Sequence, residues 1–307
     1  MKYILSLNRC LLAAVLCAAI SSGAQEKKES AKGAQPKQGK QQVRLPEGVK
    51  ALRDLEYVPN GHERQKLDLY LPEKGDKLPL IVFVHGGGWR QGSKEGSPAI
   101  RFSGNGYAVA SINYRLSQHA IWPAQIEDCK AAVRWLRANA AKYRLDPDRI
   151  GVWGGSAGGH LVALLGTTGD VKDFDKGENL KFSSRVQAVC DWFGPADFTL
   201  WQDSNSDTLT QLFGGKMTKA QALNASPVTY VTKGDAPFLI MHGDKDPLVA
   251  MAHSERLRDA LKAAGVEVAL DVLPGAAHGT PEFRSEESLA KIAAFFDKHL
   301  KSVETGK

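Results

Sequence analysis

The sequence predicts an α/β domain whose mostly parallel sheet is covered by helices on both faces. Short apolar runs bounded by glycine and polar residues alternate with longer helical patterns over residues 78–300. An Asn60-Gly61 pair separates two earlier runs, which is a strong signal for a β-hairpin. Such alternation is typical of a parallel sheet, and the hairpin adds an antiparallel edge to it. Residues 46–303 have the length of one large domain of this class.

The N-terminal region is expected to be an export signal followed by a linker. In residues 1–24, basic Lys2 and Arg9 accompany a short apolar core, and small residues precede a cleavage site expected after Ala24. The core is too short to span a bilayer comfortably, so we expect no stable membrane insertion, with a retained anchor as the alternative. Residues 25–45 are rich in Lys and Gln and can bury little, which favours a disordered linker. The mature protein is therefore expected in the periplasm or outside the cell.

The basic charge of the chain belongs to this N-terminal region. Residues 1–44 hold eight Lys or Arg and two Glu, whereas residues 45–307 hold 32 basic and 32 acidic side chains. A nucleic-acid enzyme needs a basic face on the folded domain itself. A formally neutral domain therefore argues against nucleic acid as a partner, and the oligomeric state is left open.

Eight strands are predicted in chain order, because each apolar run is short and each is followed by turn residues or a helical pattern. The first two strands form the hairpin and the other six alternate with helices. The strands are expected at 55–58, 66–71, 78–84, 107–113, 149–153, 186–191, 237–242 and 267–273, and the helices near 95–104, 123–141, 157–166, 250–264 and 284–300.

Residues 196–235 interrupt this alternation. Two short apolar groups, residues 197–201 and 209–213, stand there among polar residues. The stretch is expected to be either a small cap over a cleft or an ordinary excursion with one or two surface helices. No longer cap is indicated, so an open cleft is expected.

A Gly-x-Ser-x-Gly pattern at residues 154–158 follows an apolar strand and precedes an apolar helix. This context indicates a nucleophile elbow, in which Ser156 occupies a sharp turn that only small neighbours permit. The hydroxyl of Ser156 would then lie at the carboxyl edge of the sheet, at the positive end of the following helix. Ser156 is the predicted nucleophile.

A second motif, His85-Gly86-Gly87-Gly88-Trp89, follows the buried strand 78–84. A glycine run lets backbone N–H groups approach a developing oxyanion, so we assign donors to Gly86 and Gly87, together with Ala157 after the nucleophile. The register of the donors within the run is open by one position. His85 precedes Ser156 in the chain, whereas a fold with a nucleophile elbow places its base after the nucleophile and last in chain order. His85 is therefore expected to be a structural hydrogen-bonding residue.

The acid and the base are predicted to follow Ser156 in that order. The strand 237–242 runs into a loop with two carboxylates, Asp244 and Asp246. We favour Asp246, because Asp244 suits a hydrogen bond within its own loop. His278, in a glycine-flanked loop after the last strand, is the predicted base, with Asp246 orienting its ring.

The other histidines and the cysteines carry weaker signals. His160 is expected to pack beside the site and His242 to end a strand, and four more histidines are expected at the surface: His62, His119, His253 and His299. No spacing of ligand residues indicates a metal, and no cofactor is expected. Cys129 and Cys190 could pair but are favoured as two separate buried thiols.

Together, the segments HGGGW, GGSAGGH, HGDKD and AAHG resemble bacterial α/β-hydrolase carboxylesterases of the hormone-sensitive-lipase-like group. The segment Asp191–Pro195 is similar to feruloyl and acetyl-xylan esterases. Gly155 stands where lipase-like relatives carry Asp, which favours that second branch. The resemblance covers roughly residues 50–300 and implies an α/β-hydrolase fold with a small cap or none.

The resemblance implies a secreted serine carboxylesterase that acts on small acyl esters, including acetyl or feruloyl groups on plant polysaccharide. The expected partner is therefore a small ester or an acylated carbohydrate. Trp89, Trp192 and Trp201 are candidates for lining the cleft, although each suits the core equally well. Three alternatives stay open: a serine peptidase, an arylformamidase and an inactive binding protein of the same fold.

Overall fold

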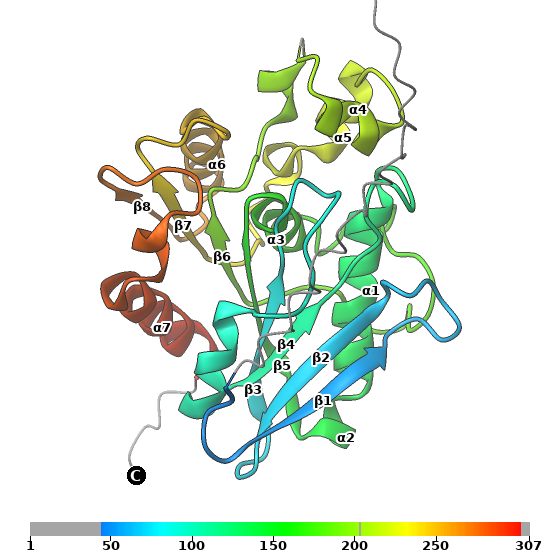
Figure 1. Cartoon of the computed structure of the whole chain (residues 1–307), viewed down its shortest axis with the longest axis vertical. Coiled ribbons are helices and arrows are strands. Elements are labelled where there is room, and N and C mark those ends of the chain that lie inside the picture. Colours follow the sequence, from blue (N-terminus) through cyan, green and yellow to red (C-terminus); the bar gives the residue numbers. More distant parts are fainter. Residues whose placement is uncertain (1–43, 203, 302–307) are drawn as a thin grey trace, which may run out of the picture. The chain divides into compact units, whose positions relative to one another are not determined.

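An eight-stranded sheet forms the centre of the computed structural model, which describes residues 44–202 and 204–301 (Figure 1). The predicted signal peptide and nearly all of the predicted linker lie outside the described residues. The strands are β1 (Val49–Glu56), β2 (Lys66–Pro72), β3 (Leu78–Val84), β4 (Ala108–Ile112), β5 (Leu145–Gly155), β6 (Ala188–Trp192), β7 (Phe238–Gly243) and β8 (Val268–Leu273).

The strand order is β1-β2-β4-β3-β5-β6-β7-β8. The strands from β4 to β8 pair in parallel, whereas β1 pairs antiparallel with β2, and β2 with β4. The predicted eight-stranded, mostly parallel sheet with an antiparallel edge is confirmed. The first strand lies earlier than expected, at Val49–Glu56, because the connection around Asn60 and Gly61 is longer than a two-residue turn.

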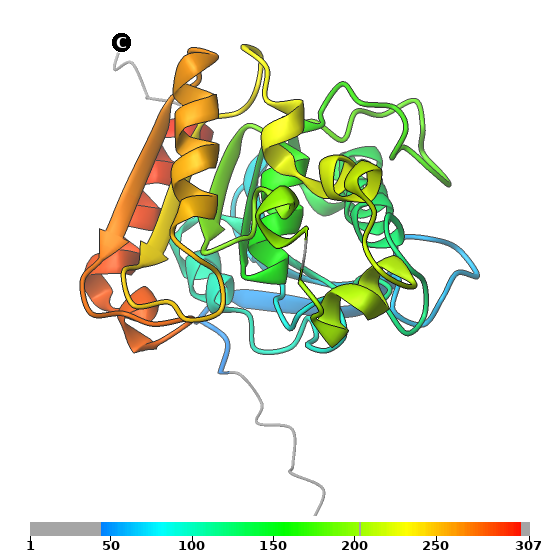
Figure 2. The same ribbon diagram turned by 90° about the horizontal axis from the view of Figure 1, so that it is seen from above.

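Helices cover both faces of the sheet, as predicted. One face carries α1 (Ala124–Ala138), α3 (Ala157–Thr167) and α6 (Ala252–Ala263), while the other carries the 3₁₀ helix η1 (Pro98–Asn105) and α7 (Glu286–Leu300). The short helix α2 (Ala140–Tyr143) and the 3₁₀ turn η4 (Pro281–Arg284) complete the connections. Figure 2 shows α6 and α7 on opposite sides of β7 and β8.

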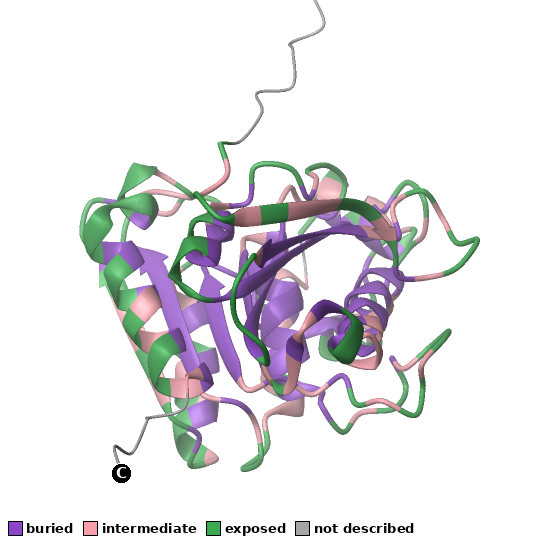
Figure 3. Ribbon diagram, turned by 90° about the horizontal axis from the view of Figure 1, so that it is seen from below, coloured by how far each residue is buried: buried purple, intermediate pink, exposed green. Residues whose placement is uncertain are grey.

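The alternation of side chains along β3 explains why both faces are covered. Leu80, Val82 and Val84 pack into one apolar cluster, and Ile81 and Phe83 pack into the other. A strand that is apolar at every position has no face suited to water, so helices must shield both sides. The central strands are accordingly buried, whereas the edge strands β1 and β8 and the outer helix faces are partly exposed (Figure 3).

The helix expected near 95–104 forms as the 3₁₀ helix η1. Ser97 caps its start by accepting a hydrogen bond from the Ala99 N–H, and it ends at Gly106 in the left-handed region. Pro98 at its first position suits the start of a helix because its missing N–H needs no partner there.

The interrupting segment at residues 196–235 folds into short helices beside the carboxyl edge of the sheet (Figure 1). They are η2 (Phe198–Trp201), α4 (Asp207–Phe213), α5 (Lys219–Ala225) and η3 (Pro227–Tyr230). Cys129 and Cys190 are buried and unpaired, as favoured. No helix in the described part of the chain is both long and apolar enough to cross a membrane.

Candidate active site

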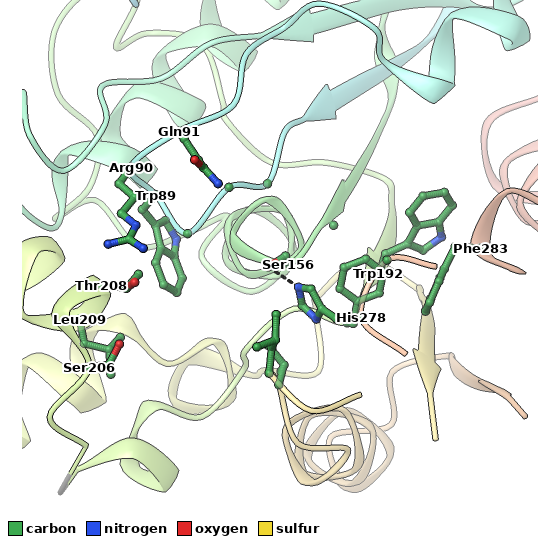
Figure 4. A pocket seen from close by; sticks show the side chains of 18 of the residues that line it. Trp89, Arg90, Gln91, Ser156, Trp192, Ser206, Thr208, Leu209, His278 and Phe283 are labelled. Carbon is green, nitrogen blue, oxygen red and sulfur yellow. Dashed lines mark hydrogen bonds between the residues drawn. The ribbon is translucent and has the colours of Figure 1, made fainter. Parts of the chain in front are cut away.

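Ser156 occupies a sharp turn between β5 and α3, at the carboxyl edge of the sheet (Figure 4). Its backbone angles are φ +56° and ψ −123°, a region that residues with a side chain rarely adopt. Two backbone hydrogen bonds hold the turn: the Ser156 N–H donates to the Trp192 carbonyl at 2.8 Å, and the His160 N–H donates to the Ser156 carbonyl at 2.9 Å. The neighbouring strand and the first turn of α3 therefore maintain the strained backbone.

Two glycines let α3 pack directly on the strand ends. A Cβ on Gly158 would lie 2.1 Å from the Val84 carbonyl oxygen and 2.8 Å from that of His85. A Cβ on Gly154 would lie 2.4 Å from the Gly158 carbonyl oxygen. These distances are shorter than any van der Waals contact, so the elbow requires glycine at both positions.

The structure brings Ser156, His278 and Asp246 together in one chain of hydrogen bonds. His278 Nε2 lies 2.9 Å from Ser156 Oγ, although the two residues are 122 positions apart. His278 Nδ1 lies 2.7 Å from Asp246 Oδ2. The Asp246 side chain is only 1% exposed, which shields this contact from water. The arrangement suits proton transfer from the serine hydroxyl to the imidazole.

The two carboxylates of the loop after β7 have different partners. Asp246 Oδ1 accepts the N–H groups of Leu248 and Val249 at 2.8 and 2.9 Å, which leaves Oδ2 for His278. Asp244 Oδ1 instead accepts the Gly275 N–H at 2.7 Å and makes no contact with His278. The favoured choice of Asp246 therefore matches the geometry, and Asp244 joins its loop to the neighbouring one.

The glycine run after β3 lies against the nucleophile. A Cβ on Gly86 would lie 2.7 Å from the Gly155 carbonyl oxygen and 3.4 Å from Ser156 Cβ. In the described part of the chain, the amides of Gly86, Gly87 and Ala157 have no hydrogen-bond acceptor. These three amides are therefore free to bind an oxyanion beside Ser156.

A cavity of about 590 Å³ opens beside Ser156 and His278. Figure 4 shows two unlike sides, with aromatic rings near His278 and a more polar group beside Trp89. The aromatic side includes Trp192, Phe193 and Phe283, and the other side includes Arg90, Ser206, Thr208 and Leu209. The segment at 196–235 supplies part of the second side, so it acts as a small cap. The lining contains two arginines and no carboxylate.

Trp89 and Trp192 both line this cavity but are almost completely buried, at 3% and 4% exposed. The Trp89 indole N–H donates to His160 Nδ1 at 3.1 Å, and the Trp192 indole N–H points at Met241 Sδ at 3.3 Å. Their polar atoms are therefore occupied, and only a small apolar surface of each is left for a ligand. Trp201 also lines the cavity and is more exposed.

Phe193 was not predicted from the sequence as a site residue. Its ring centroid lies 4.5 Å from those of His278 and Phe283, and its backbone φ is +41°. The segment 191–195 stood out only through family resemblance, and nothing in the local pattern indicates that its phenylalanine reaches a loop after β8.

The buried histidines are structural. Burial lowers the pKa of His160 to about 3, and its Nε2 donates to the Ala225 carbonyl at 2.7 Å. His242 is buried against Asp246: its Nε2 lies 3.4 Å from Asp246 Oδ2 and 2.9 Å from the Val249 carbonyl oxygen. His253 is fully buried, which contradicts the expected surface position. It occupies the inner face of α6, where its Nδ1 accepts the Asp197 N–H at 3.2 Å.

Metal-binding geometry is absent from residues 44–202 and 204–301, where no three His, Cys, Asp or Glu side chains gather suitably.

A family model described as BD-FAE matches residues 67–261, which include the turn at Ser156 and the loop that carries Asp246. The chain belongs to the BD-FAE family. This match and the relatives below confirm the resemblance to bacterial α/β-hydrolase esterases that the motifs indicate, and the fold is that of an α/β-hydrolase.

Proteins similar to this BD-FAE member are named as esterases. Esterase LipQ of Mycobacterium tuberculosis is 34% identical over 73% of this chain and 56% of its own length. A truncated carbohydrate esterase from gut microbiota has a TM-score of 0.74 at 33% identity, covering 82% of this chain and 97% of that one. An acetyl ester-xyloside bifunctional hydrolase from Caldicellulosiruptor lactoaceticus has a TM-score of 0.67 at 25% identity, covering 83% and 94%. The chain spans about half the length of the curated relatives that it matches.

Proposed function

We propose that this protein is a serine carboxylesterase that removes small acyl groups, acetyl or feruloyl, from plant polysaccharide. The observation that carries the proposal is the continuous contact from Ser156 Oγ through the His278 ring to Asp246 Oδ2. It lies at the mouth of a cavity and beside three unpaired backbone amides. A nucleophile, a base, an acid and oxyanion donors are together sufficient for acyl transfer.

In the first step, Ser156 Oγ attacks the carbonyl carbon of the ester while His278 Nε2 takes the hydroxyl proton. The carbonyl oxygen becomes an oxyanion, which the amides of Gly86, Gly87 and Ala157 stabilise. The C–O bond to the alcohol then breaks, and the alcohol leaves with the proton from His278. Water repeats the sequence on the acyl-serine, releases the acid and restores the serine hydroxyl.

The pocket supports an acylated saccharide as the substrate. Aromatic walls suit the flat faces of sugar or phenolic rings, and the hydroxyl groups of Ser206 and Thr208 suit polar substituents. The lining has Arg90 and Arg284 but no carboxylate, so it suits neutral or acidic esters and disfavours cationic ones. Two structural relatives, one named a carbohydrate esterase and the other an acetyl ester-xyloside bifunctional hydrolase, support the same class.

We further propose that the protein is exported, because residues 1–24 have the pattern of a signal peptide. A polysaccharide cannot enter the cytoplasm intact, so an esterase that acts on it has to work outside that compartment. Sequencing the N-terminus of the protein recovered from the periplasm or the medium would test this. Recovery only in the cytoplasm with Met1 retained contradicts it.

The function is tested with purified protein and p-nitrophenyl acetate. Ser156→Ala should lower kcat by on the order of 10⁴-fold or more, because the nucleophile itself is removed. Ser183→Ala is the matched control, since Ser183 is exposed in the loop before β6 and lies away from the pocket. Activity of Ser156→Ala within a few-fold of the unchanged protein contradicts the mechanism.

A panel of four substrates then separates esterase activity from the alternative activities. The substrates are acetylated xylan, methyl ferulate, N-formylkynurenine and a proline anilide. The proposal requires the highest kcat/KM on one of the first two. Preference for the third or fourth would indicate an arylformamidase or a peptidase, and no turnover at all would indicate a binding protein.

A further inference from the structure

Arg64, in the connection between β1 and β2, contacts three separate segments beside the glycine run. Its Nε donates to the Tyr114 carbonyl at 3.3 Å, and its Nη2 donates to the Gly92 carbonyl at 2.9 Å. The same Nη2 lies 3.0 Å from Nε2 of His85. Neither a binding role nor a catalytic role follows from these contacts directly, because Arg64 is not among the residues that line the cavity.

The contact with Arg64 determines which nitrogen of His85 carries the proton. A guanidinium group can only donate, so His85 Nε2 must accept and the hydrogen must lie on Nδ1. His85 Nδ1 then donates to the Gly86 carbonyl oxygen, 2.7 Å away. Burial, together with the nearby charge of Arg64, lowers the pKa of His85 to about 4, so the ring stays neutral with one donor and one acceptor.

The Gly86 carbonyl and the Gly87 N–H belong to the same peptide group. In a planar trans peptide these two groups point in opposite directions. Because His85 holds the carbonyl oxygen on its own side, the Gly87 N–H must point away from His85. Gly86 itself lies against Ser156, since a Cβ on it would be 3.4 Å from Ser156 Cβ.

Gly92 packs directly against this peptide and against the His85 ring. A Cβ on Gly92 would lie 2.5 Å from the Gly86 carbonyl oxygen and 2.6 Å from His85 Nδ1. The His85 ring also stacks on Tyr114, with centroids 4.4 Å apart and planes 15° apart. Arg64 bonds to the backbone of both Gly92 and Tyr114, so it holds the two segments that enclose the His85 ring.

We propose that Arg64 is a positioning residue for the oxyanion hole: it sets the tautomer of His85 and thereby the direction of the Gly87 N–H. This inference rests on the proposed function, because the amide of Gly87 matters only if an oxyanion forms at Ser156. The carbonyl of Gly86 is the part of the peptide that His85 controls, and the amide of Gly87 is the part that the reaction uses.

The experiment compares Arg64→Gln and Arg64→Lys with Arg144→Gln as a matched control. Arg144 makes the same kind of contact, donating to the carbonyls of Pro72, Glu73 and Gly75, but it joins the connection after β2 to the turn before β5. Loss of an oxyanion donor costs on the order of 10²–10³ in kcat, so a misdirected donor should cost about 10- to 100-fold. Arg64→Lys keeps the charge but not the planar guanidinium fork, so its kcat should lie between those of Arg64→Gln and Arg144→Gln.

Two readouts separate positioning from a general loss of structure. The affinity for a trifluoromethyl ketone, which forms an oxyanion on Ser156, should fall in parallel with kcat, while KM for p-nitrophenyl acetate stays within about 2-fold. The ¹⁵N shifts of the His85 ring should change from a pure Nδ1–H tautomer to a mixture. Melting curves show whether each variant is folded at the assay temperature.

A His85→Phe background completes the test, since phenylalanine keeps the stack on Tyr114 but has no nitrogen to orient. Arg64→Gln should then cost less than about 3-fold, because its effect passes through His85. Folded Arg64→Gln with normal kcat, or the same loss in both backgrounds, overturns the inference. If the unchanged protein hydrolyses no ester, the proposed function fails instead, and the ¹⁵N measurement still decides whether Arg64 sets the tautomer.

Discussion

Asp246→Asn is the most informative single change at this site because it alters one atom of the acid and leaves its loop intact. In the structure, Oδ1 of Asp246 accepts the amides of Leu248 and Val249. An asparagine can keep both bonds with its own Oδ1. Its Nδ2 then replaces the oxygen that lies 2.7 Å from His278 Nδ1.

The expected loss follows from the hydrogen-bond polarity. Two N–H donors cannot face each other at 2.7 Å, so His278 must move its hydrogen from Nδ1 to Nε2. Nε2 would then be a donor toward Ser156 Oγ and unable to accept the serine proton. A wrong tautomer of this kind lowers kcat by about 10⁴-fold, which corresponds to roughly 5.5 kcal/mol in the barrier.

The assay is kcat for p-nitrophenyl acetate, with Asp244→Asn as the matched control. Asp244 lies in the same loop and accepts the Gly275 N–H, so its loss should change kcat by no more than a few-fold. Asp246→Ala should also lower stability by about 2 kcal/mol, because the two loop amides lose their acceptor. Retention of a tenth of the activity by Asp246→Asn, or a larger loss in Asp244→Asn, would refute the reasoning.

Three further predictions concern packing, pH and charge. Gly158→Ala should lower the unfolding free energy by several kcal/mol, because its Cβ would lie 2.1 Å from the Val84 carbonyl oxygen; urea denaturation beside a Gly234→Ala control, where nothing lies closer than 4.0 Å, checks this. Burial holds the pKa of His160 near 3, below the 6.5 expected unfolded, so stability should fall as pH drops from 6.5 toward 3, and His160→Asn should reduce that slope by up to about 1.4 kcal/mol per pH unit. Urea denaturation at pH 6.5 and at pH 4.5 measures this, and an equal drop in unfolding free energy for the unchanged protein and for His160→Asn would contradict it. Arg90→Glu adds a carboxylate to a lining that has none, so kcat/KM for an acidic ester should fall about 5-fold more than for a neutral one; an equal fall for both would show that charge is not the cause.

The sequence alone was sufficient to predict the succession of strands and main helices along the chain and the sharp turn at Ser156. These features depend on neighbouring residues: apolar runs make buried strands, and glycine permits the turn around Ser156 and the close approach at Gly158. His278 could also be singled out as the candidate base, because a fold of this kind places its base after the last strand, here in a glycine-flanked loop.

Other features depend on contacts between segments far apart in the chain. Asp244 and Asp246 stand two positions apart in similar surroundings, and only the loop geometry shows which one meets His278. His253 has the polar neighbours of a surface residue, yet α6 turns it inward.

The aromatic side of the cavity and the contact between Arg64 and His85 were likewise decided by the tertiary structure. Phe193 reaches His278 from the end of a different strand, and Arg64 reaches His85 from the connection between β1 and β2. Local sequence patterns report backbone preference and burial, which depend on near neighbours. The partner of a polar side chain is set by how strand ends converge in space, and that convergence has no signature in any single segment.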